Sequence, residues 1–134
     1  MPVAGLITVR SDYRPDETMT RLEAAVRARG LTVFARVAHA AGAAAVDMPL
    51  RPTDLLIFGN ARGGTPLMQT AQTAGIDLPL KALVWQDEAG ETWLSYNDPG
   101  WIAQRHMAGS EATAAMTALL HALATAATAR PGPP

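Results

Sequence analysis

Short apolar runs and helical patterns alternate along this chain of 134 residues. Apolar and polar positions alternate over residues 31–38, and the run over residues 54–58 is almost wholly apolar. Both patterns are typical of strands. Met19, Leu22 and Val26 instead recur at helical spacing, which predicts a helix with one apolar face. On this basis strands are expected over residues 5–10, 31–38, 54–58, 81–86 and 91–96.

Residues that favour helix ends divide the rest of the chain. Pro15 suits the first turn of a helix and Gly30 its end, so the first helix follows the first strand. Thr65 can cap a later helix that has Pro66 at its first position and is closed by Gly75. Two further helices are expected, one after a cap at residue 98 and one over residues 110–128.

The predicted elements follow the order β-α-β, connector, β-α-β-β-α-α. In the connector, residues 40–46 are rich in alanine around a glycine, so a short helix and a turn are both open. Residues 87–90 form the loop of an antiparallel hairpin. We predict an α+β class: a single compact domain over residues 1–128, with a mostly antiparallel sheet covered by helices on one face. The Pro-rich residues 129–134 are expected to be a disordered tail.

Composition excludes several classes of function. With 11 Lys and Arg against 12 Asp and Glu, the net charge of -1 provides no basic surface, so no nucleic-acid partner is expected. The chain has no cysteine, which excludes disulfides, a thiolate nucleophile and cysteine-ligated metals. No apolar run approaches the ~20 residues of a membrane span, and the beginning lacks a signal-peptide pattern. A cytoplasmic protein without a membrane partner is therefore expected.

The glycine-rich stretch over residues 59–65 is the first candidate binding site. It has neither the dinucleotide fingerprint nor the phosphate-loop spacing. Free N–H groups at the start of the following helix, with Arg62 and the flexible Gly63 and Gly64, can hold a carboxylate or a phosphate. Alternatively, the glycines only supply the unusual dihedral angles of a tight strand-to-helix turn.

The second candidate lies over residues 96–106, where polar side chains gather at a strand end and on the next helix. Arg105 follows Trp101 by four positions, so its guanidinium can stack on the indole and still bind an anion. Alternatively, the segment is only a capped helix.

His39 and His106 are candidate acid or base groups, because a histidine titrates near neutral pH. Neither lies in a recognisable catalytic motif. With His121 they show no metal-ligand spacing, so no metal site is predicted, although His39 and His106 can still converge in space with Asp98.

A series of spaced motifs extends along the chain from about Ile7 to His106. They are Glu17-Thr18-x-x-x-Leu22, Gly30-Leu31-x-Val33-Phe34-Ala35, His39-Ala40-Ala41, Leu55-Leu56-Ile57-Phe58-Gly59-Asn60, Gly64-Thr65-Pro66-Leu67-Met68, Asp77-Leu78-Pro79-Leu80-Lys81, Tyr96-Asn97-Asp98-Pro99 and Arg105-His106. This series resembles the DUF302 family, bacterial and archaeal proteins of unknown function whose known structures are called TT1751-like.

The resemblance implies a β-α-β(4)-α domain like a TBP-type half repeat without its DNA-binding role, and a homodimer. Two positions depart from the family pattern. Ala38 stands where the family usually has an acidic residue before the histidine, which weakens an argument for an Asp–His pair there. Ala61 replaces a proline after Gly-Asn, so this loop need not be rigid.

Three hypotheses for function follow. The preferred one is a homodimeric domain that binds a small molecule or anion in a polar cleft; its cofactor requirement is unknown. The second is an enzyme of unknown reaction that uses His39 or His106 as acid or base. The third is a dimeric interaction or stress-response module without a ligand. The residues proposed for the polar cleft are His39, Asn60, Thr65, Lys81, Tyr96, Asn97, Arg105 and His106.

Overall fold

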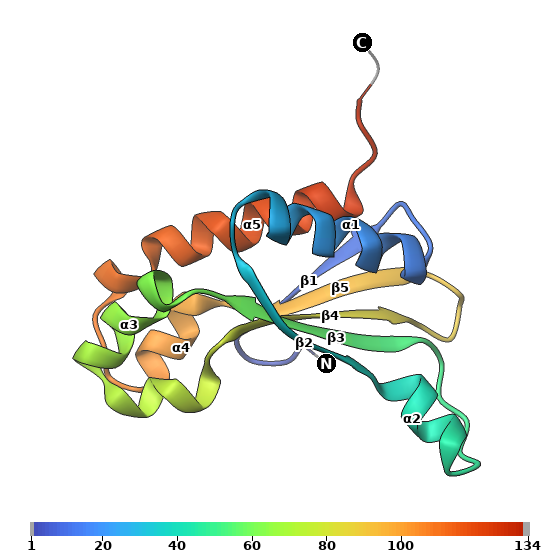
Figure 1. The fold of residues 1–134 in the computed structure, drawn as a ribbon, viewed down its shortest axis with the longest axis horizontal. Helices are drawn as coiled ribbons and strands as arrows, with labels where there is room; N and C mark the ends of the chain where they lie inside the picture. Colours follow the sequence, from blue (N-terminus) through green and yellow to red (C-terminus); the bar gives the residue numbers. More distant parts are fainter. Residues whose placement is uncertain (1, 133–134) are drawn as a thin grey trace.

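A five-stranded antiparallel sheet forms the centre of the domain (Figure 1). The structure is a computed structural model and describes residues 2–132. The order of neighbouring strands is β1-β5-β4-β3-β2, so the first two strands of the chain form the edges. The strands are β1 (Leu6–Ser11), β2 (Thr32–Ala38), β3 (Thr53–Gly59), β4 (Leu80–Gln86) and β5 (Thr92–Asn97).

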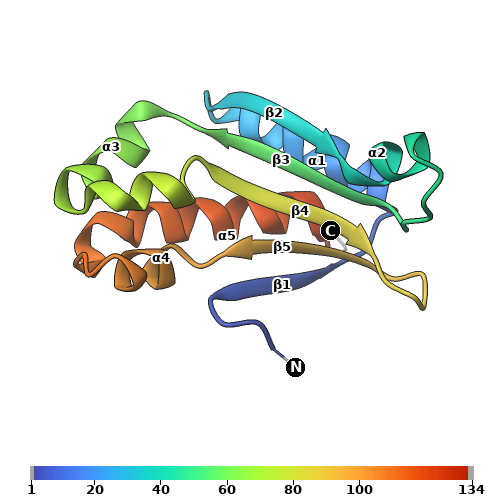
Figure 2. The ribbon, with the colours of Figure 1, turned by 90° about the horizontal axis from the view of Figure 1, so that it is seen from below.

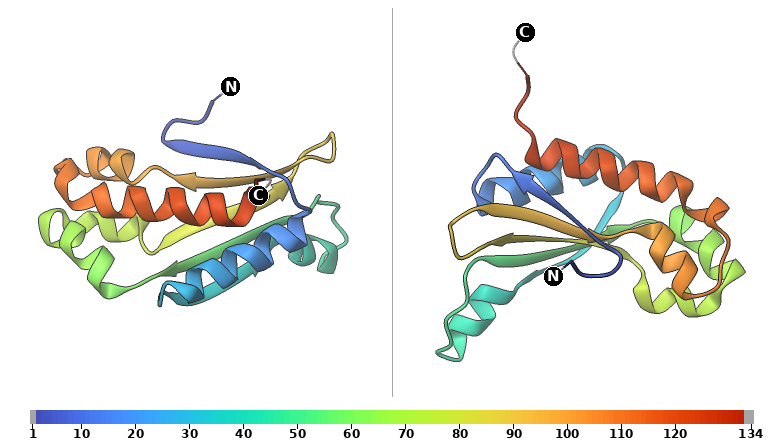
Figure 3. Two further views of the ribbon diagram at one scale, coloured as in Figure 1. Left: turned by 90° about the horizontal axis from the view of Figure 1, so that it is seen from above. Right: turned by 180° about the vertical axis from the view of Figure 1, so that it is seen from behind.

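Two long helices, α1 (Pro15–Ala28) and α5 (Ala114–Thr128), pack against each other on one face of this sheet (Figure 3). Across the described residues, no helix crosses the opposite face, which is called the open face below (Figure 2). This arrangement confirms the predicted α+β class and the covering of the sheet on one side.

The shorter helices lie beyond the two ends of the sheet (Figure 1). At one end, α2 (His39–Ala45) follows β2 and projects on the side of the open face. The other end holds α3 (Ala61–Thr70), α4 (Pro99–Arg105) and two 3₁₀ segments, η1 (Gln72–Asp77) and η2 (Ser110–Thr113). The glycine-rich stretch and α4 thus lie at the same end of the domain (Figure 1).

The hydrophobic core lies between the sheet and the helix pair α1 and α5. Met19, Leu22 and Val26, the positions that predicted the first helix, are all at most 1% exposed. They pack with alternate positions of the strands, such as Phe58 of β3 and Leu94 of β5. Alternation places one set of side chains in the core and leaves the other set on the open face.

The prediction for the start of α3 was wrong. The helix begins at Ala61, four residues before the predicted cap Thr65, and it ends at Thr70 rather than near Gly75. The side-chain oxygen of Asn60 accepts a hydrogen bond of 2.7 Å from the backbone N–H of Gly63, so Asn60 is the cap. Asparagine is among the strongest N-cap residues, and its cap starts the helix before Pro66 is reached.

Other boundaries also differ. Of residues 40–46, left open between a helix and a turn, all but Val46 belong to α2, in which no residue is buried. The first four residues of the predicted helix 110–128 form η2, and only the remainder is α-helical. Of the predicted tail, residues 129–132 have no regular secondary structure, and Pro133 and Pro134 lie outside the described residues.

Candidate functional site

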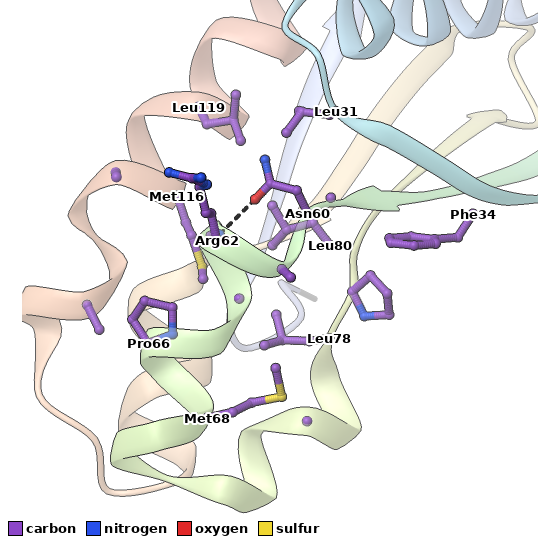
Figure 4. A pocket seen from close by; sticks show the side chains of 18 residues that line it. Leu31, Phe34, Asn60, Arg62, Pro66, Met68, Leu78, Leu80, Met116 and Leu119 are labelled. Carbon is purple, nitrogen blue, oxygen red and sulfur yellow. Dashed lines mark hydrogen bonds between the residues drawn. The ribbon is translucent and has the colours of Figure 1, made fainter.

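A cavity of about 610 Å³ lies beside the first turns of α3 (Figure 4). Elements far apart in the sequence surround it: the start of β2, the end of β3, the link from η1 to β4, and the first half of α5. Its volume is within the roughly 300–1,000 Å³ of ordinary small-molecule sites. The larger apolar side chains that line it include Leu31, Phe34, Met68, Leu78, Leu80, Met116 and Leu119.

The lining is almost free of polar side chains. Asn60 and Arg62 are the polar residues among those that surround the cavity, and both lie where α3 begins (Figure 4). The amide oxygen of Asn60 is used by the cap on Gly63. The guanidinium of Arg62 takes part in no ion pair or hydrogen bond with residues 2–132. Arg62 is therefore a charged group at an apolar cavity, with its hydrogen-bond donors available.

Gly64 contributes to the space beside α3. A Cβ atom at this position would lie 3.6 Å from Cδ1 of Leu78 and 3.7 Å from Cε of Met68, which is ordinary van der Waals contact. A larger side chain at this position would therefore project toward Leu78 and Met68. The missing side chain of Gly64 therefore leaves space in the cavity next to Leu78 and Met68.

A second polar arrangement surrounds Asp77, the last residue of η1. Nη1 of Arg105 donates to both carboxylate oxygens of Asp77 at 2.8 Å. Nε2 of His106 lies 2.6 Å from Oδ2 of the same carboxylate, and Nδ1 of His106 lies 2.9 Å from the hydroxyl of Thr73. Nζ of Lys81 donates to the backbone carbonyl of Asp77 at 3.2 Å. These five residues are called the Asp77 cluster.

The surroundings of Asp77 shift two pKa values. Burial acts to raise the pKa of the Asp77 carboxyl, but the hydrogen bonds from His106 and Arg105 and the charges of both residues outweigh it, so this pKa lies below its ordinary value. Burial lowers the pKa of Lys81, and the charge of Asp77 opposes that effect. Asp77 is therefore held as a carboxylate.

The Asp77 cluster joins η1 to α4. When Nε2 of His106 donates to Asp77, Nδ1 of the neutral ring accepts from the hydroxyl of Thr73, which is how a base activates a hydroxyl group. However, neither Thr73 nor Asp77 lines the cavity, and Arg105 occupies both oxygens of the carboxylate. The direct consequence of these contacts is to hold in place the segment that contributes Leu78 to the cavity.

Comparison with known families identifies this architecture. The model of the domain of unknown function DUF302 matches residues 7–126. The chain belongs to the DUF302 family. The crystal structure of an uncharacterized conserved DUF302 protein from Bacillus stearothermophilus superimposes with a TM-score of 0.83, over 93% of this chain and 99% of that one. At 20% sequence identity, this likeness establishes the fold of the domain.

Two curated relatives are more similar in sequence. Proteins named fluoride-specific ion channel FluC 1, from Brucella suis and Brucella abortus, are each 46% identical over 117 residues, or 87% of this chain. The chain spans only 46% and 43% of their lengths. Their name therefore describes proteins more than twice the length of the matched region. Over residues 2–132 of the DUF302 domain, no helix combines the length and apolar character needed to cross a membrane.

The DUF302 domain does not bring the eight predicted residues into one polar cleft. Lys81, Arg105 and His106 meet in the Asp77 cluster, and Asn60 lies at the cavity. Thr65 is exposed and does not line the cavity. The large cavity at this end of the domain is apolar, because the segments that surround it contribute leucines, methionines and prolines.

The other predicted residues lie elsewhere in the domain. His39 is exposed at the start of α2, at the opposite end of the sheet from α4 (Figure 1). Tyr96 is 6% exposed on the helix-covered face, where burial, with the charge of Asp98 adding to it, raises the pKa of its hydroxyl. Asn97 is the last residue of β5, on the open face opposite Leu6.

The predicted stacking of Arg105 on Trp101 does not form in the part of the chain that the structure describes. Arg105 binds Asp77, and none of the cation–π contacts of the described residues joins it to Trp101. Trp101 instead packs against Gly5. Among residues 2–132, no three His, Asp or Glu side chains converge in a group that could hold a metal ion.

Sequence reasoning missed Asp77 and the apolar lining of the cavity. Asp77 was named only within a family motif and not as a candidate site residue, although it lies three positions before the start of β4. An acidic residue followed four positions later by Lys81 was the available signal. No local pattern connects Leu31, Met68 and Leu119, which come from three separate segments of the chain.

Proposed function

We propose that this DUF302 domain binds a small molecule with a mainly apolar body in the cavity beside α3. The observation that supports the proposal is the cavity itself, which combines a volume of about 610 Å³ with a lining whose polar side chains are confined to Asn60 and Arg62. Binding sites for small molecules are concave and mostly apolar, with a few polar groups that orient the ligand. Burial of an apolar ligand would contribute roughly 25 cal/mol for each Å² removed from water.

Binding of a neutral fluorescent probe tests this proposal. N-phenyl-1-naphthylamine fluoresces strongly only in apolar surroundings, so we expect the protein to enhance its emission in a saturable way. Ala115 of α5 lines the cavity, and Ala118 lies exposed on the same helix without lining it. Ala115→Phe should fill part of the cavity and weaken probe binding about tenfold or more, which corresponds to about 1.4 kcal/mol.

Ala118→Phe is the matched control, because it adds the same side chain to the same helix away from the cavity. It should leave probe binding unchanged. An absence of saturable emission with the wild-type protein, or equal binding by the two variants, would contradict the proposal.

We also propose that the domain acts as a homodimer joined through its open face. Leu55, Ile57, Leu83, Trp85 and Trp93 lie on this face and are only partly buried. With strands about 4.8 Å apart and a rise of about 3.3 Å per residue, the face measures roughly 24 by 20 Å. Together with α2, the side chains of this face offer an area that approaches the ~800 Å² that each partner buries in a stable interface.

The position of α2 supports the same proposal. This helix has seven residues, none of them buried, and it projects beside the open face (Figure 1). Isolated helices this short are marginal in water, so packing against another surface is expected to stabilise it. A second copy supplies such a surface, and the net charge of -1 gives two copies little mutual repulsion.

Sedimentation velocity provides the measurement. We expect the mass obtained for the wild-type protein to be twice the 14.1 kDa mass of the chain. Leu83→Glu places a charge at the centre of the open face and should shift the protein to a monomer, because two such charges would oppose each other across a symmetric interface. Ala118→Glu, on the exposed surface of α5, is the control and should remain dimeric. A wild-type protein that stays monomeric at all concentrations would refute the dimer.

A further inference from the structure

We infer that the ligand of this cavity is an amphipathic anion, with its negatively charged head at Arg62 and its apolar chain beside α3. The inference rests on the proposed function and adds to it the chemical class of the ligand. Among residues 2–132, the only formal charge on the cavity lining is the guanidinium of Arg62, and no acidic side chain lines the cavity. An apolar cavity with a single cation at one end matches a molecule with one anionic end.

The contacts of Arg62 distinguish it from most other arginines of the chain. Arg10, Arg21, Arg36 and Arg105 each form an ion pair with a nearby carboxylate. Arg62 has no such partner among residues 2–132, and its side chain lies at the surface where α3 begins. Its planar fork of donors suits a carboxylate or a phosphate, which it can bind through two parallel hydrogen bonds.

The position of Arg62 also explains how a charged head would be accommodated. Arg62 is exposed, whereas the apolar lining residues Leu80 and Met116 are 8% and 5% exposed. A head group at Arg62 therefore stays at the boundary with water and keeps part of its hydration, while the chain enters the apolar region. A fully apolar ligand would leave the guanidinium unused.

The first turn of α3 adds to the positive potential at the same end of the cavity. Ala61 and Arg62 occupy its first two positions, and both line the cavity. The partial positive charge of a helix N-terminus favours a negative group there. The side chain of Asn60 accepts a hydrogen bond from the N–H of Gly63. The N–H groups of Ala61 and Arg62 therefore take no part in the cap.

Displacement of the neutral probe by two ligands with the same chain tests the inference. Decanoate carries a carboxylate, and 1-decanol carries a neutral hydroxyl on a chain of equal length. Arg62→Gln removes the charge but keeps a polar side chain. We expect this variant to bind decanoate about five- to tenfold more weakly and to bind 1-decanol as the wild-type protein does.

Arg51→Gln is the matched control, because it removes the same charge before β3, at the end of that strand remote from the cavity. It should leave the binding of both ligands unchanged. Binding of decanoate to the wild-type protein should also weaken as the salt concentration is raised, because screening reduces interactions between exposed charges.

The outcomes separate the two proposals. If both ligands displace the probe and Arg62→Gln affects neither, the anionic head is refuted while the apolar ligand stands. If neither the probe nor either ligand binds the wild-type protein, the proposed function fails and the inference fails with it. A selective loss of decanoate binding in Arg62→Gln supports both.

Discussion

Phe58→Ala should lower the free energy of unfolding by about 3–5 kcal/mol, the range for removal of a buried aromatic side chain. Phe58 is 0% exposed and is the largest of the fully buried side chains. It lies in β3, paired with Leu80 on one neighbouring strand and Val33 on the other, and it faces the helix pair. Its neighbours belong to several elements, so they cannot all move to close the space left by the ring.

Phe34→Ala is the matched control, since Phe34 and Phe58 are the two phenylalanines of the chain. Phe34 is 54% exposed and lies where the register between β2 and β3 shifts. Its replacement should cost less than about 1 kcal/mol, because little apolar area returns to water. Urea unfolding followed by circular dichroism measures both values. Equal losses from the two substitutions would contradict the core assigned to this sheet.

The fold of the domain was largely predictable because burial on one side produces local patterns. The spacing of Met19, Leu22 and Val26 indicates a helix that packs through a single face. The alternation of apolar and polar positions in the strands indicates a sheet that is covered on one side. The hairpin over residues 87–90 was equally local. In each case the evidence lies within a few residues, and the tertiary structure agrees with it.

The start of α3 was not predictable by the same reasoning. Asn60 and Thr65 are both good cap residues, and Pro66 suits the first position of a helix. The choice between the two caps depends on where β3 ends and how the chain leaves it. That information is tertiary, so the local rule selected the wrong residue.

The candidate site was predictable in its parts and not in its assembly. The Arg105-His106 pair and Asn60 were singled out as polar residues near strand ends, but the partner of the pair, Asp77, is 28 residues away from Arg105. In the structure, Arg105 and His106 are paired with Asp77, and the cavity is formed by apolar residues. Residue type indicates which chemistry is available, whereas only the fold determines which groups remain free to perform it.

Asp77→Asn should lower the free energy of unfolding at neutral pH by about 2–3 kcal/mol. The side chain of Asp77 is 15% exposed and accepts hydrogen bonds from Arg105 and His106. Hydrogen bonds to a charged group contribute about 1.5–3 kcal/mol, and an amide replaces one acceptor oxygen with a donor that faces other donors. The loss should be measured by urea unfolding at pH 7.

The pH dependence of this loss identifies its cause. The pKa of Asp77 is lower in the folded protein than its ordinary value of 3.8, so the carboxylate stabilises the fold above that pH. This contribution is lost as the pH falls through the folded-state pKa, when the carboxyl becomes protonated. The difference in unfolding free energy between the wild-type protein and Asp77→Asn should therefore shrink between about pH 5 and pH 2.

Asp47→Asn provides the control for charge alone. Asp47 is exposed and has a φ of 60°, a conformation that asparagine tolerates well, so its replacement should change the unfolding free energy by less than about 0.5 kcal/mol. If Asp77→Asn were equally neutral, the Asp77 cluster would not stabilise the fold. If its loss were the same at pH 2 and pH 7, the ionised carboxylate would not be the source. A loss confined to the higher pH range assigns the stabilisation to the pairing of η1 with α4 and hence to the segment that completes the cavity.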